Sequence, residues 1–304
     1  MTVSIIIPHY NQPALLARCL QSVPRRADVQ VVVVDDGSSA ECAAELMRLK
    51  AEWPEVVWLE QTNAGAGAAR NLGLQHATGQ YVVFADSDDE FSDSFSALLD
   101  DQASTSADIV FFNARCLSDA PSRPSFKTAH LNWTMQLPER QRQFRLRYQF
   151  TEPWCKLIRR QLLIDNNITF EPTRIQNDVM FSISAGHFAR TVATDPRVAY
   201  VVHDREGSVA KQQKVERLVE QTGVQARQNR FFREHGVPIF SYKVLRPMIL
   251  LALNGQFDGS RLCYAELQKA GMTRGQILLR LLAYPFALLS YVELKRRWRK
   301  YVIH

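Results

Sequence analysis

The chain has 304 residues, of which 46% are apolar and 22% charged, a length and composition that fit one or two folded domains and exclude wholesale disorder. Its formal net charge of +6 is uneven, because residues 205–304 carry 18 Lys and Arg against seven Asp and Glu, a net of +11, and the rest carries −5. Five cysteines, an odd number without C-x-x-C spacing, argue against a disulfide framework or a zinc site and favour a reducing, cytoplasmic location.

The N-terminus does not look like a signal peptide, because an apolar run starts at residue 3 with no basic residues before it. No run of 18 apolar residues occurs, since the best candidate, residues 277–289, is short and contains Arg280. We therefore expect neither a cleaved leader nor a membrane-spanning helix.

The first third of the chain alternates short apolar runs with helix-forming segments. Apolar runs at residues 3–7, 29–34, 56–59 and 81–85 predict four strands. Runs that are apolar throughout are typical of parallel strands that are buried on both faces. The alternation predicts an α/β fold with a doubly wound, mostly parallel sheet.

Local signals mark the ends of the helices between these strands. Asn11 is expected to cap the first helix, and Ser38 with Glu41 has the spacing of a capping box for the second. The third helix is expected at residues 64–77, with Gly79 just beyond its end.

After this region the regular alternation fades. The pattern predicts, in order, a strand at 109–113, a loop at 118–125, a helix at 137–150, a helix after 154–160, a helix at 178–188 and two short strands within 191–203. From about residue 210 the pattern is helical. We therefore expect a sheet domain at residues 1–210 and a helical, basic C-terminal region at residues 211–304.

Polar residues follow three of the predicted strands, at residues 8–11, 35–38 and 86–89. Ligands of doubly wound sheets bind beyond the carboxyl ends of the strands, so we expect these clusters to converge on one crevice. In the third cluster, the carboxylates of Asp86 and Asp88 can both approach one hard cation, Mg²⁺ or Mn²⁺. The alternative is a solvated acidic turn.

Two other residues of the first third suit a nucleotide ligand. Asp36 could accept a hydrogen bond from a uracil ring or a ribose, or could serve as a helix cap. Arg70, in the segment N-A-G-A-G-A-A-R-N at residues 63–71, could pair with a phosphate or with a nearby carboxylate. The small residues of that segment also suit close packing of a helix on the sheet.

In the later part of the chain, four residues each have a possible functional role and a possible structural one. Asp178 lies at an expected helix start, where it could be a cap or a general base. Trp154 could be a platform for a sugar ring or a core aromatic residue, and Lys156 could bind phosphate or be a surface lysine. His203 could be a third metal ligand or a diphosphate contact, although a lone histidine is more often neither.

The chain resembles the family-2 glycosyltransferases with the A-type fold. The resemblance covers residues 1–210 and rests on an ordered series of motifs: V-S-I-I-I-P-H-Y-N at 3–11, V-D-D-G-S at 34–38, N-A-G at 63–65 with A-R-N at 69–71, residues 79–89, W-C-K-L at 154–157, N-D-V-M-F at 177–181, and residues 200–208.

This resemblance implies a metal-dependent, inverting transfer of a hexose from a nucleoside-diphosphate sugar, with UDP as the expected nucleotide, to a hydroxyl of a glycan or lipid-linked acceptor. The cofactor would be Mn²⁺ or Mg²⁺, held by Asp86 and Asp88 with His203 as the third candidate ligand. The donor-binding residues would be Pro8, Tyr10, Asp36, Arg70, Asp86, Ser87 and Asp88.

On the acceptor side, the resemblance implies that Asp178 removes the proton of the attacking hydroxyl. Trp154, Lys156 and Asn177 are the expected acceptor-binding residues. The family usually has Glu-Asp where this chain has Asn177-Asp178, so the base is kept and the neighbouring acid is lost, a change that bears on acceptor binding.

The C-terminal region lies outside these motifs. An apolar stretch at residues 277–292 precedes K-R-R-W-R-K-Y at 295–301, a combination that suits a helix in the membrane interface. The alternatives are packing on the catalytic domain or on a second subunit in a homo-oligomer. A membrane contact would suit an acceptor on polyprenyl diphosphate in bacterial surface polysaccharide synthesis, at the inner face of the cytoplasmic membrane.

Two other functions share some of these features. A nucleotidyltransferase can use a similar nucleotide-binding sheet and would release pyrophosphate. A non-enzymatic basic protein could bind nucleotides or nucleic acid, but the absence of a recognisable nucleic-acid motif argues against nucleic acid as a partner.

Overall fold

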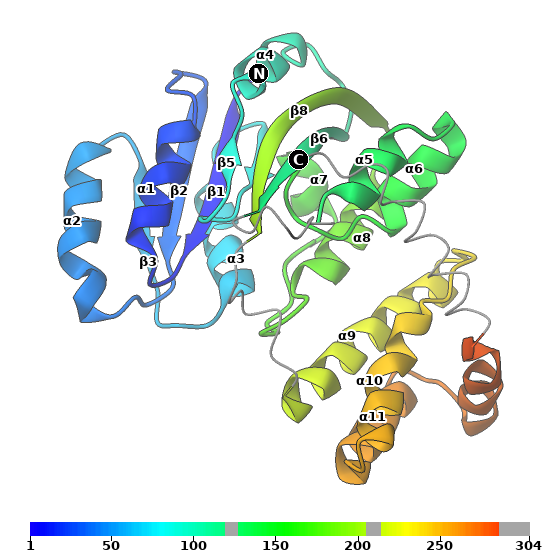
Figure 1. Cartoon of the computed structure of the whole chain (residues 1–304). Helices are drawn as coiled ribbons and strands as arrows, with labels where there is room; N and C mark the ends of the chain where they lie inside the picture. Colours follow the sequence, from blue (N-terminus) through cyan, green and yellow to red (C-terminus); the bar gives the residue numbers. More distant parts are fainter. Residues whose placement is uncertain (119–126, 205–213, 286–304) are drawn as a thin grey trace. The chain divides into compact units, whose positions relative to one another are not determined.

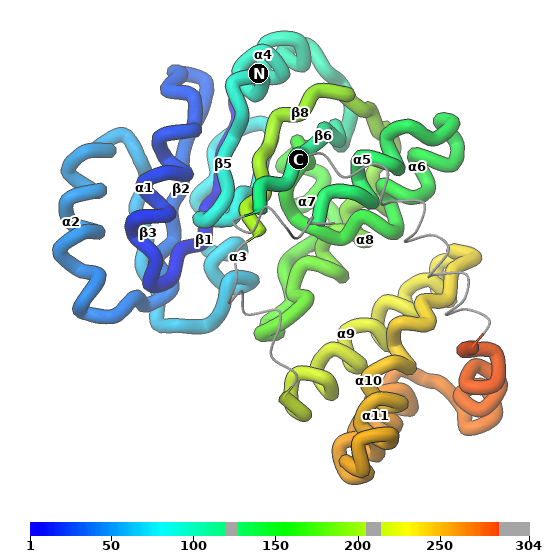
Figure 2. Tube along the Cα trace, in the orientation of Figure 1, coloured from blue at the N-terminus to red at the C-terminus, as the bar shows by residue number. Residues whose placement is uncertain are grey.

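The computed structural model describes residues 1–118, 127–204 and 214–285. These residues form two compact units. Figures 1 and 2 show the chain coloured by position in the sequence. Residues 1–118, 127–172 and 181–204 make the first unit, and residues 173–180 and 214–285 make the second. The expected sheet domain at residues 1–210 thus differs from the first unit, because residues 173–180 group with the second.

An eight-stranded sheet organises the first unit, in the strand order β3-β2-β1-β4-β7-β6-β8-β5. The first four of these strands are mutually parallel. They are β1 (Val3–His9), β2 (Val29–Asp35), β3 (Val57–Glu60) and β4 (Tyr81–Phe84). Every residue of β1 and β4 is buried, which explains the mostly apolar runs in the sequence. The four predicted strands are therefore confirmed.

The other half of the sheet is mixed. Strand β7 (Lys156–Arg159) is antiparallel to β4 and to β6 (Ile109–Ser118), and β8 (Val192–Asp204) is parallel to β6. The short strand β5 (Glu90–Phe91) pairs antiparallel with β8 at the sheet edge. In Figure 1, β8 is the long curved strand beside β6 and β5. The α/β class is confirmed, and the mixed half of the sheet refines it.

Residues 192–204 form one strand where the sequence predicts two. Asp195 and Pro196 break the apolar pattern, but they lie where the register between β6 and β8 shifts in a bulge. The Asp195 carboxylate accepts hydrogen bonds from the backbone N–H and the Nε of Arg197, at 3.0 and 2.8 Å. The bulge therefore satisfies these polar groups without ending the strand.

Helices cover both faces of the parallel half of the sheet. Val33 of β2 belongs to the same apolar cluster as Leu16 of α1 (Pro13–Ser22). Its neighbour Val34 packs instead with Ala69 of α3 (Ala66–His76). Because successive residues of a strand face opposite sides, α1 and α3 cover opposite faces, as a doubly wound sheet requires.

The other helices of the first unit connect or flank these strands. They are α2 (Ala43–Glu52), α4 (Ser94–Asp101), α5 (Ala129–Met135), α6 (Glu139–Tyr148) and α7 (Arg160–Asp165). Helix α8 (Asp178–Phe188) begins in the segment that groups with the second unit. The helices predicted at 64–77, 137–150 and 178–188 are therefore confirmed.

Two predicted helix caps are wrong. Helix α1 begins at Pro13 without a side-chain cap, and Asn11 instead accepts a hydrogen bond from the Ser39 N–H at 2.7 Å and donates its own N–H to Ser38 Oγ at 2.8 Å. The hydroxyl of Ser38 donates to Asp35, so no capping box with Glu41 forms. Asn11 thus ties two loops together, and Ser38 bonds to the end of its own strand, so neither side chain is available to cap a helix.

Gly79 serves close packing rather than a helix end, because α3 already ends at His76 with Ala77 as its C-cap. A Cβ at Gly79 would lie 2.5 Å from the Ser4 nitrogen and 2.7 Å from the Val3 carbonyl carbon, both rigid backbone atoms. We therefore expect Gly79→Ala to lower the free energy of unfolding by about 1–3 kcal/mol, as overpacking does.

Urea denaturation monitored by circular dichroism measures this loss. A matched control is Gly275→Ala, since a Cβ there meets no atom within 4 Å. In a helix this control should change stability by no more than about 1 kcal/mol. Equal stability of Gly79→Ala and the unmodified protein would contradict the predicted clash.

The second unit is helical, as predicted for the chain beyond residue 210. It contains α9 (Val215–Glu234), α10 (Arg246–Leu253), α11 (Phe257–Lys269) and a helical segment at residues 274–285. These helices share their own apolar cluster, which includes Leu251, Leu267 and Ile277. The predicted basic and aromatic run at 295–301 lies outside the described residues. Across 1–118, 127–204 and 214–285, every helix falls short of the length and hydropathy that crossing a membrane requires.

Candidate functional site

The acidic turn Asp86–Asp89 lies directly beyond the carboxyl end of β4. The backbone N–H of Asp89 closes the turn on the Asp86 carbonyl at 3.1 Å, and Ala85 donates to the Ile6 carbonyl of β1 at 3.1 Å. One ligand atom each from Asp86, Asp88 and Asp89 lies within 4.8 Å of the others. Three carboxylates at this spacing fit a hard divalent cation. The sequence predicted two of them and missed Asp89.

Asp89 is the most buried of the three, with 3% of its surface exposed. Its carboxylate accepts the backbone N–H of His203 at 2.9 Å and is hydrogen-bonded by Tyr200. Burial, followed by the charges of Asp86 and Asp88, raises its pKa well above the ordinary value. Asp89 therefore keeps its proton more readily than an ordinary aspartate does, and a bound cation would favour its ionised form.

Arg70 holds Asp86 in place. Its guanidinium, 6% exposed, donates from Nη2 to Asp86 Oδ1 at 2.5 Å and lies 5.4 Å from the centre of the Phe170 ring. Of the two partners that the sequence allowed, phosphate or carboxylate, the structure shows the carboxylate. Arg70 therefore positions Asp86, and direct contact with a donor stays a prediction.

Asp36 organises the loop before α3. Its carboxylate accepts hydrogen bonds from Gln61 Nε2 at 2.7 Å and from the N–H groups of Ala64 and Gly65 at 2.8 and 2.9 Å. Gly65 has a φ of +90°, which favours glycine. Asp36 thus shapes this loop, and its contact with a nucleotide stays a prediction.

The polar clusters after β1 and β2 meet through Asn11, which bonds to Ser38 and Ser39. Tyr10 beside it is half exposed, whereas Pro8 is buried in β1. The expected convergence of all three clusters is therefore seen in part: two are joined directly, and the third lines the cavity described next. Roles for Pro8, Tyr10 and Ser87 in donor binding stay predictions.

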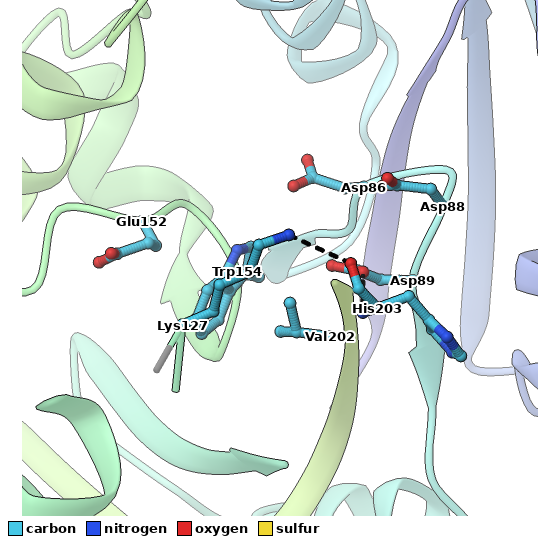
Figure 3. A pocket seen from close by; sticks show the side chains of 8 residues that line it. All are labelled: Asp86, Asp88, Asp89, Lys127, Glu152, Trp154, Val202 and His203. Atoms are coloured by element: carbon cyan, nitrogen blue, oxygen red, sulfur yellow. Dashed lines mark hydrogen bonds between the residues drawn. The ribbon is translucent and has the colours of Figure 1, made fainter. Parts of the chain in front are cut away.

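A cavity of about 310 Å³ opens beside the acidic turn. Figure 3 shows its lining side chains: Asp86, Asp88, Asp89, Lys127, Glu152, Trp154, Val202 and His203. The Trp154 ring stacks on Tyr200, with 5.8 Å between the ring centroids and an interplanar angle of 16°. Trp154 therefore contributes to the cavity wall, and a sugar contact stays a prediction.

His203 lines the cavity, but its ring is directed elsewhere. The imidazole Nε2 lies 2.7 Å from the Glu90 carboxylate, which also contacts Arg18 at 3.0 Å. In Figure 3 the ring points away from Asp86 and Asp88. Among the described residues, the third clustered carboxylate is Asp89. The metal role of His203 stays a prediction that this ring orientation does not favour.

Lys156 is 1% exposed and does not lie on the surface. Its ammonium donates to the Phe150 carbonyl at 3.2 Å, to Ser182 Oγ at 2.8 Å and to the Glu152 carbonyl. These contacts hold the segment that carries Glu152 and Trp154. The expected acceptor contact of Lys156 stays a prediction, because the contacts seen are internal.

Glu152 and Lys127 are cavity residues that no motif in the sequence marks. Burial acts to raise the pKa of Glu152, but the His130 imidazole, 3.3 Å from its carboxylate, prevails and lowers it to about 2. Glu152 is therefore ionised at neutral pH. Neither residue belongs to a motif, and only the fold brings them to one cavity, so no spacing in the sequence could have identified them.

Asn177 and Asp178 belong to the second unit. Asp178 lies in the first turn of α8, and Asn177 is buried and donates to the Thr173 carbonyl at 3.4 Å. The same segment is fixed to α9 by the Arg174 N–H, which donates to Glu220 at 3.0 Å. A base role for Asp178 and an acceptor role for Asn177 stay predictions.

The mixed sheet, the acidic turn after β4 and the adjoining cavity define the class as an A-type glycosyltransferase fold. The sequence model described as glycosyl transferase family 2 matches residues 4–166, more than half of the chain. The chain belongs to this family.

Curated relatives agree with this assignment. The chain is 28% identical over 221 residues to the uncharacterized glycosyltransferase EpsJ of Bacillus subtilis (strain 168), a match that covers 69% of this chain and 63% of that protein. It is 30% identical over 189 residues to the uncharacterized glycosyltransferase YibD of Escherichia coli (strain K12), covering 59% and 55%. It is 29% identical over 209 residues to the poly(ribitol-phosphate) beta-glucosyltransferase of Bacillus spizizenii, covering 66% and 32%. The matches thus span less than two thirds of each relative.

Solved structures share the fold. S. aureus TarS 1–349, in complex with UDP-GlcNAc, has a TM-score of 0.56 at 20% identity, covering 90% of this chain and 93% of that one. The mannosyltransferase PcManGT from Pyrobaculum calidifontis, in complex with GDP-Man and Mn²⁺, has a TM-score of 0.53 at 18% identity, covering 99% and 82%. The predicted A-type fold is confirmed.

Proposed function

We propose that this protein transfers a hexose from a nucleoside-diphosphate sugar, with UDP as the first candidate nucleotide, to a hydroxyl of a glycan or lipid-linked acceptor in bacterial surface polysaccharide synthesis. The observation that carries the proposal is the group of three carboxylates within 4.8 Å, beside a cavity in a family-2 chain. The complexes of TarS with UDP-GlcNAc and of PcManGT with GDP-Man support the donor class.

Asp86, Asp88 and Asp89 would hold Mn²⁺ or Mg²⁺, which supplies positive charge to the donor diphosphate. The Mn²⁺ in the PcManGT complex supports this choice. The chain's own contribution is to fix the carboxylates: Arg70 holds Asp86, and the His203 N–H holds Asp89. A site fixed in this way binds without reorganising at each turnover.

The proposed reaction inverts the anomeric carbon. The acceptor oxygen forms a bond to that carbon as the bond to the β-phosphate oxygen breaks, and the nucleoside diphosphate leaves with the electron pair. Asp178 takes the proton of the acceptor hydroxyl. Trp154 offers an aromatic wall, and Glu152, which is ionised, can accept hydrogen bonds from sugar hydroxyls.

A thermal-shift screen of UDP-sugars and GDP-sugars, with and without Mn²⁺, tests the donor class. A ligand that binds only the native state raises the melting temperature, so we expect a rise that requires both the nucleotide sugar and the cation. Product analysis then separates the two enzyme classes. Release of nucleoside diphosphate supports the glycosyltransferase, whereas release of pyrophosphate would establish a nucleotidyltransferase instead.

We further propose that the second unit contacts the inner face of the cytoplasmic membrane. Its helices expose large apolar side chains: Leu253, Phe257, Leu262, Leu278, Leu279 and Leu282. The sequence adds a basic run at residues 295–300. Exposed apolar residues followed in the sequence by clustered basic residues suit the surface of an anionic bilayer. Homo-oligomer formation through the same surface stays an alternative.

Flotation with anionic liposomes tests this contact. We expect the triple change Leu278→Ser, Leu279→Ser and Leu282→Ser to reduce recovery with the liposomes, because it removes apolar area that the bilayer would bury. Met47→Ser is the matched control, since Met47 is 65% exposed in the first unit. Equal recovery of the triple variant and the control would contradict the contact.

A further inference from the structure

Lys127 differs in charge from the acidic residues around it in the cavity. Four of the described residues that line the cavity are carboxylates: Asp86, Asp88, Asp89 and Glu152. Within the described lining, Lys127 has the only side chain whose charge is positive at any pH near neutrality. Ionised carboxylates repel a diphosphate that enters beside them, and a lysine ammonium adds positive charge to that of a divalent cation.

The position of the Lys127 ammonium is fixed relative to the acidic turn. Its Nζ donates to the His203 carbonyl at 3.2 Å and lies 3.3 Å from the Asp204 carboxylate. The N–H of the same residue, His203, donates to Asp89 at 2.9 Å. One residue at the end of β8 thus links the ammonium to the acidic turn, and Figure 3 shows the ammonium directed to the side of the cavity where that turn lies.

Lys127 and Lys156 show two different uses of a lysine near this cavity. Lys156 is 1% exposed and its ammonium contacts internal carbonyl and hydroxyl oxygens, which is a packing role. The Lys127 side chain is 39% exposed and lines the cavity. A compact ammonium on a flexible stem binds phosphate as a point charge.

We propose that Lys127 binds the diphosphate of the donor and stabilises it as the leaving group; this inference rests on the proposed function. When the bond between the anomeric carbon and the β-phosphate oxygen breaks, its electron pair stays on that oxygen. Negative charge on the diphosphate therefore grows, and an ammonium beside it binds the transition state more strongly than the ground state. The acceptor proton goes to the base, so Lys127 remains protonated throughout.

Isothermal titration in the presence of Mn²⁺ tests the role with two ligands, UDP and uridine, and with GDP and guanosine as a second pair. Lys127→Met keeps the unbranched side chain, one atom shorter, and removes the charge. We expect it to weaken diphosphate binding by about 10-fold or more, the usual range for a charge-assisted hydrogen bond, and to leave nucleoside binding unchanged. Lys127→Arg should restore much of the diphosphate affinity.

The matched control is Lys50→Met, because Lys50 also pairs with a carboxylate, Glu60, and lies outside the cavity. It should bind both ligands as the unmodified protein does. Unchanged UDP and GDP affinity in Lys127→Met would overturn the inference about Lys127 and leave the proposed function standing. Equal losses for diphosphate and nucleoside would overturn it in favour of a structural role. If the unmodified protein binds no diphosphate with any divalent cation, the proposed function falls, and the inference with it.

Discussion

Asp88→Asn is expected to lower kcat by about 10²–10³-fold, the cost of removing one preorganised charge from a site of this kind. The Asp88 carboxylate is one of three within 4.8 Å that would hold the cation, and asparagine keeps its shape while removing its charge. Initial rates of nucleoside diphosphate release at saturating donor and Mn²⁺ measure the effect. Asp88 is a better choice than Asp86, because a change at Asp86 would also leave the buried Arg70 without its carboxylate.

The control for this prediction is Asp93→Asn. Asp93 is an exposed carboxylate at the start of α4, near the acidic turn in sequence and outside the cavity. It should leave kcat and the Mn²⁺ dependence unchanged. If Asp88→Asn had the kcat of the unmodified protein at every Mn²⁺ concentration, Asp88 would not be a ligand.

The second large effect is expected from Asp178→Asn. A general base contributes about 10²–10⁴-fold to the rate, so kcat should fall by that factor. Donor affinity should remain unchanged, because the proposed donor contacts lie in the first unit. Steady-state kinetics give kcat, and titration with UDP gives the donor-side affinity separately.

Asp258→Asn is the matched control, because Asp258 lies in the first turn of α11 in the same unit and is 96% exposed. The alternative role of Asp178 is a helix cap. That role would appear as little change in rate and little change in stability, because asparagine caps a helix about as well as aspartate does. Normal turnover of Asp178→Asn would therefore remove the base from the proposed mechanism.

Much of the sheet could be predicted from the sequence. Strands β1, β2 and β4 are parallel and largely buried, and burial on both faces favours the mostly apolar runs at 3–7, 29–34 and 81–85, which only Ser4 and Gln30 interrupt. The residue types that usually mark the ends of helices were less informative. Asn11 and Gly79 have the right residue type for a helix end, but tertiary contacts with Ser39 and with β1 determine their actual roles.

The candidate site, too, could be predicted from the sequence only in part. Asp86 and Asp88 were identifiable because they follow a buried strand directly and share one short spacing. Lys127 and Glu152 reach the same cavity from a separate part of the chain, and no local pattern reports a contact of that kind. The contacts of Lys156 could not be predicted from the sequence either, since the fold buries its ammonium among backbone carbonyls, and its acceptor contact stays a prediction.

Metal-dependent binding of a nucleoside diphosphate tests the central claim most directly. UDP and GDP would be titrated into the unmodified protein and into Asp88→Asn, each with Mn²⁺ and again with EDTA. We expect one of the two nucleotides to bind the unmodified protein with Mn²⁺. EDTA should weaken this binding by about 10-fold or more, because it removes the positive charge that the cation would supply to the diphosphate, and Asp88→Asn should show no such difference. Equal affinity with Mn²⁺ and with EDTA in the unmodified protein would contradict the central claim.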